Sequence, residues 1–271
     1  MSEPTHDWHC WDLAKAASAH YGGDKSLHAR AQHAHEIYQS STMSALLAAV
    51  YEGTVSYGEI ARHGDFGVGT FNGLDGEMLA VDGAFFHLHS DGTASVVDPS
   101  DLTPFAVVTF FRGDARRPID QVTSRQELET IIDELVPGQN SFYPIRVEGR
   151  FRHVVTRTAA RQRAPYRPLV DATADQVVSR FSDVNGTLVG FRAPDYAQGI
   201  TVAGYHLHFI DAARRSGGHV FDFVLESGTL LLDEDVDLHV ELSETAALVG
   251  ARLAGHDLDA EITAAEGPRP G

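Results

Sequence analysis

The chain contains a single cysteine, Cys10, among its 271 residues. One thiol cannot form an intramolecular disulfide, which favours a reducing compartment, and it excludes a metal site built from several cysteines. Lysine is almost as scarce, since Lys15 and Lys25 are the only two. The body of the chain therefore offers neither a Schiff-base lysine nor the lysine of a phosphate-binding P-loop.

Long apolar runs and basic residues are also lacking. No run approaches the roughly 18 residues of a membrane span, and the N-terminus has no basic segment followed by an apolar one, as a secretory signal would. Lysine and arginine number 21 against 38 acidic residues, for a net charge of -17. This charge opposes binding to nucleic acid or to an anionic membrane. The missing signal favours a cytoplasmic protein, and an anionic small-molecule substrate would need a local cationic pocket.

The composition is that of a globular protein, with 43% hydrophobic residues and a length that suits one large domain or two lobes. Residues 1–35 are polar and rich in histidine, and we interpret them as an N-terminal extension. Helical and strand-like segments both occur up to a proline-containing stretch at 165–168. The chain beyond this stretch is mostly strand-like. A second, β-rich lobe is therefore predicted to begin there.

Local patterns predict several elements. An apolar stripe predicts a helix over 41–52. Matches to the capping box predict further helices that start at Ser56, Ser124 and Thr173. The segment 64–78 holds five glycines in fifteen residues, which indicates tight turns between short strands. No lysine follows this segment, so we do not expect a nucleotide-binding loop.

Three histidines have a spacing from which their geometry follows. Residues i and i+2 of a strand point to the same face, so His206 and His208 project together. A polar, glycine-ended turn over 211–218 predicts a hairpin that returns His219 to the level of His208. Three neutral imidazoles with an open fourth position are the usual protein half of a catalytic zinc site. We therefore expect zinc, although iron, cobalt, nickel or manganese accept similar ligands.

The other histidines lack the spacing that brings these three together. The chain holds two further His-x-His pairs, His33/His35 and His87/His89. The first pair lies in the polar N-terminal segment, and no third histidine returns on the strand-like run after the second pair. His239 belongs to an alternating pattern and is expected on the solvent side of a half-buried strand.

Charged residues outside the histidine motif leave alternatives open. Arg157 shares a strand face with apolar residues, where an arginine is costly unless it meets an anion. The residues alone favour a structural salt bridge over a substrate role for it. Glu77, at the edge of the glycine-rich segment, could be a general acid or base, or a solvated turn residue. Glu261 and Glu266 lie in a short tail whose pattern decides nothing.

Several longer segments carry a resemblance to a known family. They are 37–43, 64–71, 74–77, 186–209, 216–223 and 237–242. Through them the chain resembles the acetolactate decarboxylase family, in order, over roughly residues 36 to 267. The resemblance implies an α/β (α+β) fold with two lobes and assembly as a homodimer. A mixed-sheet lobe is expected over 36–168 and a smaller β-rich lobe, which carries the metal, over 169–271.

The resemblance also implies an activity and a set of site residues. Members of the family convert 2-acetolactate to acetoin and carbon dioxide with a zinc ion. The family's metal ligands fall on His206, His208 and His219, its active-site glutamate and arginine on Glu77 and Arg157, a pocket position on Thr70, and a late glutamate on Glu266, with Glu261 as the alternative.

The chemistry is consistent with these residues. Acetolactate is a β-keto acid with an α-hydroxyl group, so loss of carbon dioxide leaves an enediolate. A divalent cation stabilises its negative charge, and a glutamic acid then protonates it. Two other functions stay open. A cupin-like metal oxygenase also uses His-x-His, although the glutamate expected a few residues later is missing. A metal-stabilised binding protein would need a fourth ligand, such as His239 or Glu226.

Overall fold

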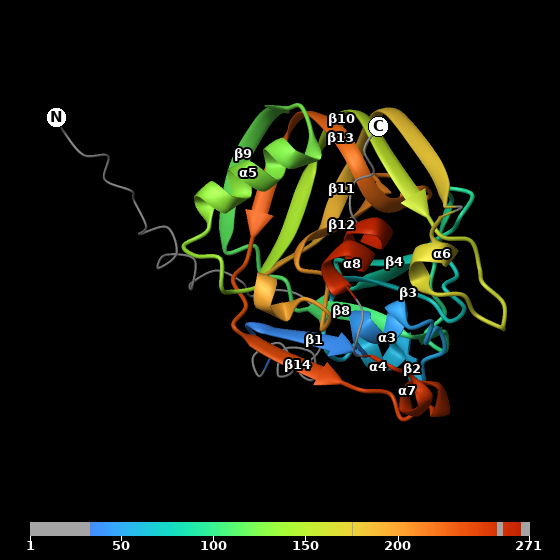
Figure 1. Ribbon diagram of the computed structural model, residues 1–271. Coiled ribbons are helices and arrows are strands. Elements are labelled where there is room, and N and C mark those ends of the chain that lie inside the picture. Colours follow the sequence, from blue (N-terminus) through green and yellow to red (C-terminus); the bar gives the residue numbers. More distant parts are fainter. Residues whose placement is uncertain (1–32, 175, 254–256, 267–271) are drawn as a thin grey trace.

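The structure, a computed structural model, describes residues 33–174, 176–253 and 257–266. Two β-sheets pack against each other (Figure 1). The first has the strand order β14-β1-β8-β3-β4-β5-β6. Its strands span Asp237–Glu241, Glu36–Ser40, Phe105–Thr109, Phe66–Thr70, Glu77–Val81, Ala84–Leu88 and Ala94–Val96, respectively. Because β1 and β14 are parallel and the other neighbours antiparallel, this sheet is mixed.

The second sheet is antiparallel and forms a small barrel. It consists of β9 (Ala115–Val122), β10 (Tyr143–Thr158), β11 (Val177–Ala193), β12 (Gly204–Asp211) and β13 (Gly217–Leu232). β10 pairs with both β11 and β13, and β12 pairs with the same two strands, so these four strands close on themselves. β9 pairs with β13 over residues 225–232, beyond the short stretch that pairs with β12. A separate ribbon joins β2 (Val55–Ser56) to β7 (Leu102–Thr103).

The helices are short and lie around the sheets. They are α3 (Met43–Leu47), α4 (Tyr57–Ile60), α5 (Arg125–Leu135), α6 (Leu169–Ala172), α7 (Ala246–Gly250), α8 (Leu258–Glu266) and the 3-10 helix Asp195–Ala197. α5 lies outside the barrel beside β9, and α8 packs against α3 and α6 (Figure 1). No helix within the described residues is long and apolar enough to cross a membrane.

One hydrophobic core joins the two sheets. Leu79 and Val107 of the first sheet belong to the same buried cluster as Val189 and Ile210 of the barrel, and Ile262 of α8 completes it. Burial of apolar surface contributes about 25 cal/mol per Å². This shared core therefore holds the barrel in a fixed position on the first sheet, and side chains at the junction keep their relative places.

The expected α/β (α+β) fold is confirmed, and the sheets show how the chain is distributed. β9 and β10 precede residue 168 yet belong to the barrel, whereas β14 follows it yet belongs to the first sheet. The two sheets therefore do not separate at that residue. The division into lobes over 36–168 and 169–271 stays a prediction, and residues 1–32 of the expected extension lie outside the described residues.

Two of the predicted helix starts are confirmed. The Ser56 side chain forms the expected capping box before α4, and the Ser124 side chain accepts from the third residue of α5. The prediction of a helix that starts at Thr173 is wrong, because β11 begins at Val177 and pairs with β10 from that residue on. The helix expected over 41–52 forms only as α3.

The glycine-rich segment forms β3 and the turn that follows it. Gly67 and Gly69 lie within β3, where a Cβ atom on Gly67 would sit 2.2 Å from the Val107 carbonyl oxygen of β8. Gly73 and Gly76 each have a φ of 75° in the turn to β4, a conformation that favours glycine. These glycines let two strands approach closely and bring the start of β4 to the junction of the two sheets.

Candidate metal centre and active site

Three histidines converge where the barrel closes. His206 and His208 lie on β12, and His219 lies on β13 directly opposite His208. One nitrogen of each ring lies within 4.8 Å of the other two, and the residues are 8%, 0% and 2% exposed. The convergence predicted from the spacing is confirmed. In the part of the chain that the structure describes, no other trio of histidine, cysteine or carboxylate side chains meets this condition.

Burial keeps this histidine trio neutral. It lowers the pKa of His206 to about 3, and the positive charges of Arg125 and Arg157 add to the effect. The pKa values of His208 and His219 fall well below the usual value, again mainly through burial. A neutral imidazole keeps the lone pair that a metal ion requires. The trio is therefore in the right protonation state for metal binding at neutral pH.

His208 is oriented so that its second nitrogen points to the site. Its Nδ1 donates to the Met78 carbonyl oxygen at 2.8 Å, which leaves the lone pair on Nε2. That Nε2 atom is buried without a hydrogen-bond partner and lies 3.7 Å from Glu77 Oε2. A buried polar atom left unpaired costs about 1–3 kcal/mol, and a metal ion would remove this cost. A ring that donates to a carbonyl while its other nitrogen binds metal is common in metal sites, so the trio fits a divalent ion.

The other histidines form different contacts. His87 Nε2 donates to the Asp75 carbonyl oxygen at 2.5 Å, and His89 Nε2 lies 2.8 Å from Ser95 Oγ. His239 is exposed on β14, as its alternating pattern predicts.

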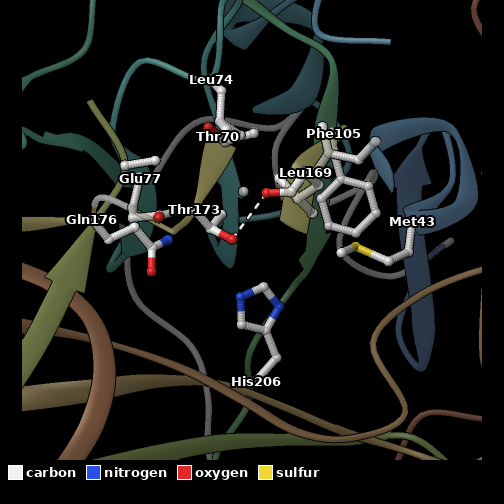
Figure 2. Close-up of a pocket in the computed structure, with 12 residues that line it drawn as sticks. Met43, Thr70, Leu74, Glu77, Phe105, Leu169, Thr173, Gln176 and His206 are labelled. Carbon is white, nitrogen blue, oxygen red and sulfur yellow. Dashed lines mark hydrogen bonds between the residues drawn. The ribbon is translucent and has the colours of Figure 1, made fainter. Parts of the chain in front are cut away.

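A pocket opens beside His206 at the junction of the sheets (Figure 2). Figure 2 shows Glu77 and Gln176 on one side of this space, and Met43 and Phe105 on the other. The complete lining is Met43, Leu46, Gly69, Thr70, Leu74, Glu77, Phe105, Ala159, Leu169, Thr173, Gln176 and His206. A few polar groups set in an apolar wall are typical of sites for small molecules.

Arg157 places a positive charge beside the trio. It lies on β10 opposite His219 of β13, and its Nη2 atom is 3.5 Å from His219 Nε2. The residue is only 4% exposed. A guanidinium in this position would meet an anionic group of a molecule bound at the trio.

Comparison with known proteins identifies the family. The sequence profile described as Alpha-acetolactate decarboxylase matches residues 37–255. The chain belongs to the alpha-acetolactate decarboxylase family. It is 47% identical over 232 residues to the alpha-acetolactate decarboxylase of Bacillus subtilis (strain 168), which covers 86% of this chain and 91% of that protein. It is also 47% identical over 230 residues to that of Klebsiella aerogenes, which covers 85% and 88%.

A solved structure supports the same assignment. The X-ray crystal structure of alpha-acetolactate decarboxylase from Bacillus subtilis strain 168 matches with a TM-score of 0.84 at 46% sequence identity. The match covers 86% of this chain and 99% of that chain.

Three more site residues were expected from the likeness to alpha-acetolactate decarboxylases: one lines the pocket and two lie on α8. Thr70 lines the pocket, and its hydroxyl donates to the Gly76 carbonyl oxygen at 2.7 Å, so it also shapes the turn that precedes Glu77. Glu266 is the last residue of α8, and its side chain lies outside what the structure describes. Glu261 is half-buried in the same helix.

Two residues near the site were missed by the sequence analysis. Gln176 lines the pocket, and its side-chain Oε1 is buried without a hydrogen-bond partner. Its local pattern matched a helix start and therefore pointed elsewhere. Arg125 is buried at the start of α5, and its side chain donates to backbone carbonyls of β12 and β13. Nothing in its sequence neighbourhood indicates contacts with strands 80 and 95 residues later in the chain.

Proposed function

We propose that this chain is a metal-dependent acetolactate decarboxylase, which converts 2-acetolactate to acetoin and carbon dioxide. The observation that carries the proposal is the histidine trio: three buried, neutral imidazoles beside a pocket, in a member of the alpha-acetolactate decarboxylase family. We propose zinc as the metal, held by His206, His208 and His219. Three histidines with one open position are a usual ligand set of catalytic zinc.

Substrate binding requires a local positive charge, because acetolactate is an anion and the chain has a net charge of -17. We assign this role to Arg157, which lies beside His219. A guanidinium can donate two parallel hydrogen bonds to a carboxylate and so orient it. The methyl groups of the substrate would meet the apolar side of the pocket, at Met43 and Phe105, with Thr70 on the wall.

The reaction needs stabilisation of negative charge and one proton. When bound, the metal supplies a Lewis acid for the keto and hydroxyl oxygens of the substrate. The carbon–carbon bond to the carboxylate breaks and carbon dioxide leaves. The electron pair of that bond stays on the remaining substrate, which becomes an enediolate. The carbon that lost the carboxylate then takes a proton, which yields acetoin. We assign proton donation to Glu77, which lines the pocket near His208, and a supporting role to Glu266 of α8, with Glu261 as the alternative.

Two other functions would use the same trio. A cupin-like metal oxygenase would consume oxygen and release no acetoin, and a metal-stabilised binding protein would do neither. The match of the family profile over residues 37–255 favours the decarboxylase over both.

The proposal is tested by a metal analysis coupled to an activity assay. We expect bound zinc, acetoin release from racemic acetolactate, loss of turnover on chelation, and recovery when zinc is returned. His208→Ala should lose metal and turnover together, whereas His239→Ala, which changes an exposed histidine, should keep both.

The possible outcomes separate the alternatives. Bound metal without acetoin would refute the assigned reaction, and oxygen consumption would then favour the oxygenase. Protein that binds no metal would refute the proposal as a whole.

Light scattering on the same sample tests the homodimer that we propose by likeness to the family.

A further inference from the structure

The short ladder between β12 and β13 ends at the histidine trio. Its register pairs are Ile210 with Gly217, Phe209 with Gly218 and His208 with His219. Beyond the last pair, β12 continues along β11 and β13 continues along β10. Main-chain pairing between the two strands therefore does not determine how far His206 lies from His219.

Arg125 bridges the two strands where their ladder ends. It is the first residue of α5, which packs on the outside of the barrel (Figure 1). Its Nη1 donates to the Val220 carbonyl oxygen at 2.9 Å, and its Nη2 donates to the Tyr205 carbonyl oxygen at 2.5 Å. Val220 follows His219 and Tyr205 precedes His206 in the chain. One planar group thus links the backbone next to two of the three ligands.

The guanidinium is itself held in place from several sides. Arg125 is 8% exposed, its Nε donates to Glu129 Oε1 at 2.7 Å, and its backbone N–H donates to Asp222 Oδ1 of β13 at 2.8 Å. The Tyr205 hydroxyl makes a second link to the same helix by donating to the Glu129 carbonyl oxygen at 2.9 Å. The first turn of α5 therefore anchors both strands at once.

We propose that Arg125 is a positioning residue, which sets the separation of His206 and His219 and thereby the affinity of the metal site. This inference rests on the proposed metal-dependent function. Arginine suits the role because its planar fork donates to two carbonyls in a fixed geometry, whereas a lysine ammonium is a single point on a flexible stem. Groups that orient metal ligands typically change metal affinity about 10- to 100-fold when they are removed.

The test compares Arg125→Gln and Arg125→Lys with the wild type and with Arg192→Gln. Arg192 is the matched control, because it is 6% exposed and its hydrogen bonds go to Asp133 and Gln139. Zinc affinity is measured by competition with a chelating indicator. The absorption spectrum of bound Co²⁺ at saturating metal reports ligand geometry, and thermal unfolding of the metal-free proteins checks that each variant folds.

Both Arg125 variants should bind zinc about 10- to 100-fold more weakly and shift the Co²⁺ bands, while Arg192→Gln keeps the wild-type affinity and spectrum. Arg125→Lys retains the positive charge, so a loss of zinc affinity in this variant would come from the changed ligand geometry alone. If Arg125→Gln does not fold, the test is made with Arg125→Lys. Wild-type affinity and spectrum in Arg125→Lys would overturn the role, as would an equal loss in Arg192→Gln. Wild-type protein without metal binding would overturn the proposed function and, with it, this role of Arg125.

Discussion

Replacement of Gly190 by alanine is expected to push His206 out of place. Gly190 lies on β11 opposite Leu207 of β12. A Cβ atom there would lie 1.9 Å from the His206 carbonyl oxygen and 2.9 Å from both the His206 carbonyl carbon and Leu207 Cα. Real Cβ atoms essentially never come within 3.0 Å of such neighbours. The two strands must therefore separate by about 1 Å at this point, since the interior offers no free space.

The size of the effect depends on which atoms collide. All of them belong to the backbone of β12, so no side-chain rotation relieves the clash. Overpacking costs about 1–3 kcal/mol, and separating β11 from β12 also weakens their ladder. We expect a loss of about 3 kcal/mol in the free energy of unfolding. Metal–ligand distances tolerate only about 0.2 Å, so zinc affinity should fall at least about tenfold.

Two measurements check this prediction. Urea unfolding of the chelator-treated protein gives the change in stability, and zinc competition gives the change in affinity. Gly138→Ala is the matched control, because a Cβ at Gly138 has no atom within 4 Å. The control should behave like the wild type in both assays. The reasoning would be refuted if Gly190→Ala were as stable as Gly138→Ala and bound zinc equally well.

Three further predictions concern the pocket and the trio. Glu77→Gln should lower kcat by about 10²- to 10⁴-fold at unchanged metal content, because an amide cannot supply the proton; full turnover in the acetoin assay would exclude Glu77 as the donor. Gln176 lines the pocket with a buried Oε1, which we expect to accept one hydrogen bond from the substrate. Gln176→Ala should therefore raise KM roughly fivefold; an unchanged KM would exclude this hydrogen bond. In chelator-treated protein, the free energy of unfolding should fall as the pH drops from 6.5 toward 3. Burial lowers the pKa of His206 to about 3, so in this range the unfolded chain takes up the proton and the folded chain does not. Urea titrations should show a slope of up to about 1.4 kcal/mol per pH unit from this group, which His206→Gln lacks; equal slopes in both proteins would contradict the assignment.

Features that depend on neighbouring residues could be predicted from the sequence. The two-residue period of a strand puts His206 and His208 on one face, and a hairpin brings His219 back opposite His208. The helix starts at Ser56 and Ser124 were predictable for the same reason, because a cap involves residues only three apart.

Features that depend on distant partners could not be predicted in this way. Thr173 matches a helix start, yet Val177 pairs with Thr158 at the end of β10. The segment forms a strand because this pairing continues along most of β11. β14 lies parallel to β1, about 200 residues earlier in the chain, and neither segment specifies the other by its own pattern.

Spacing alone was thus enough to predict the histidine trio and its hairpin, and composition gave the acidic character of the chain. Family likeness drew attention to Glu77, but the pocket around it exists only because the barrel packs on the first sheet. Gln176 and Arg125 reach the site from segments with no local signal for it. Groups far apart in the chain come together only when the chain packs. This packing buries the trio, which keeps its histidines neutral, and it fixes the position of each group around them.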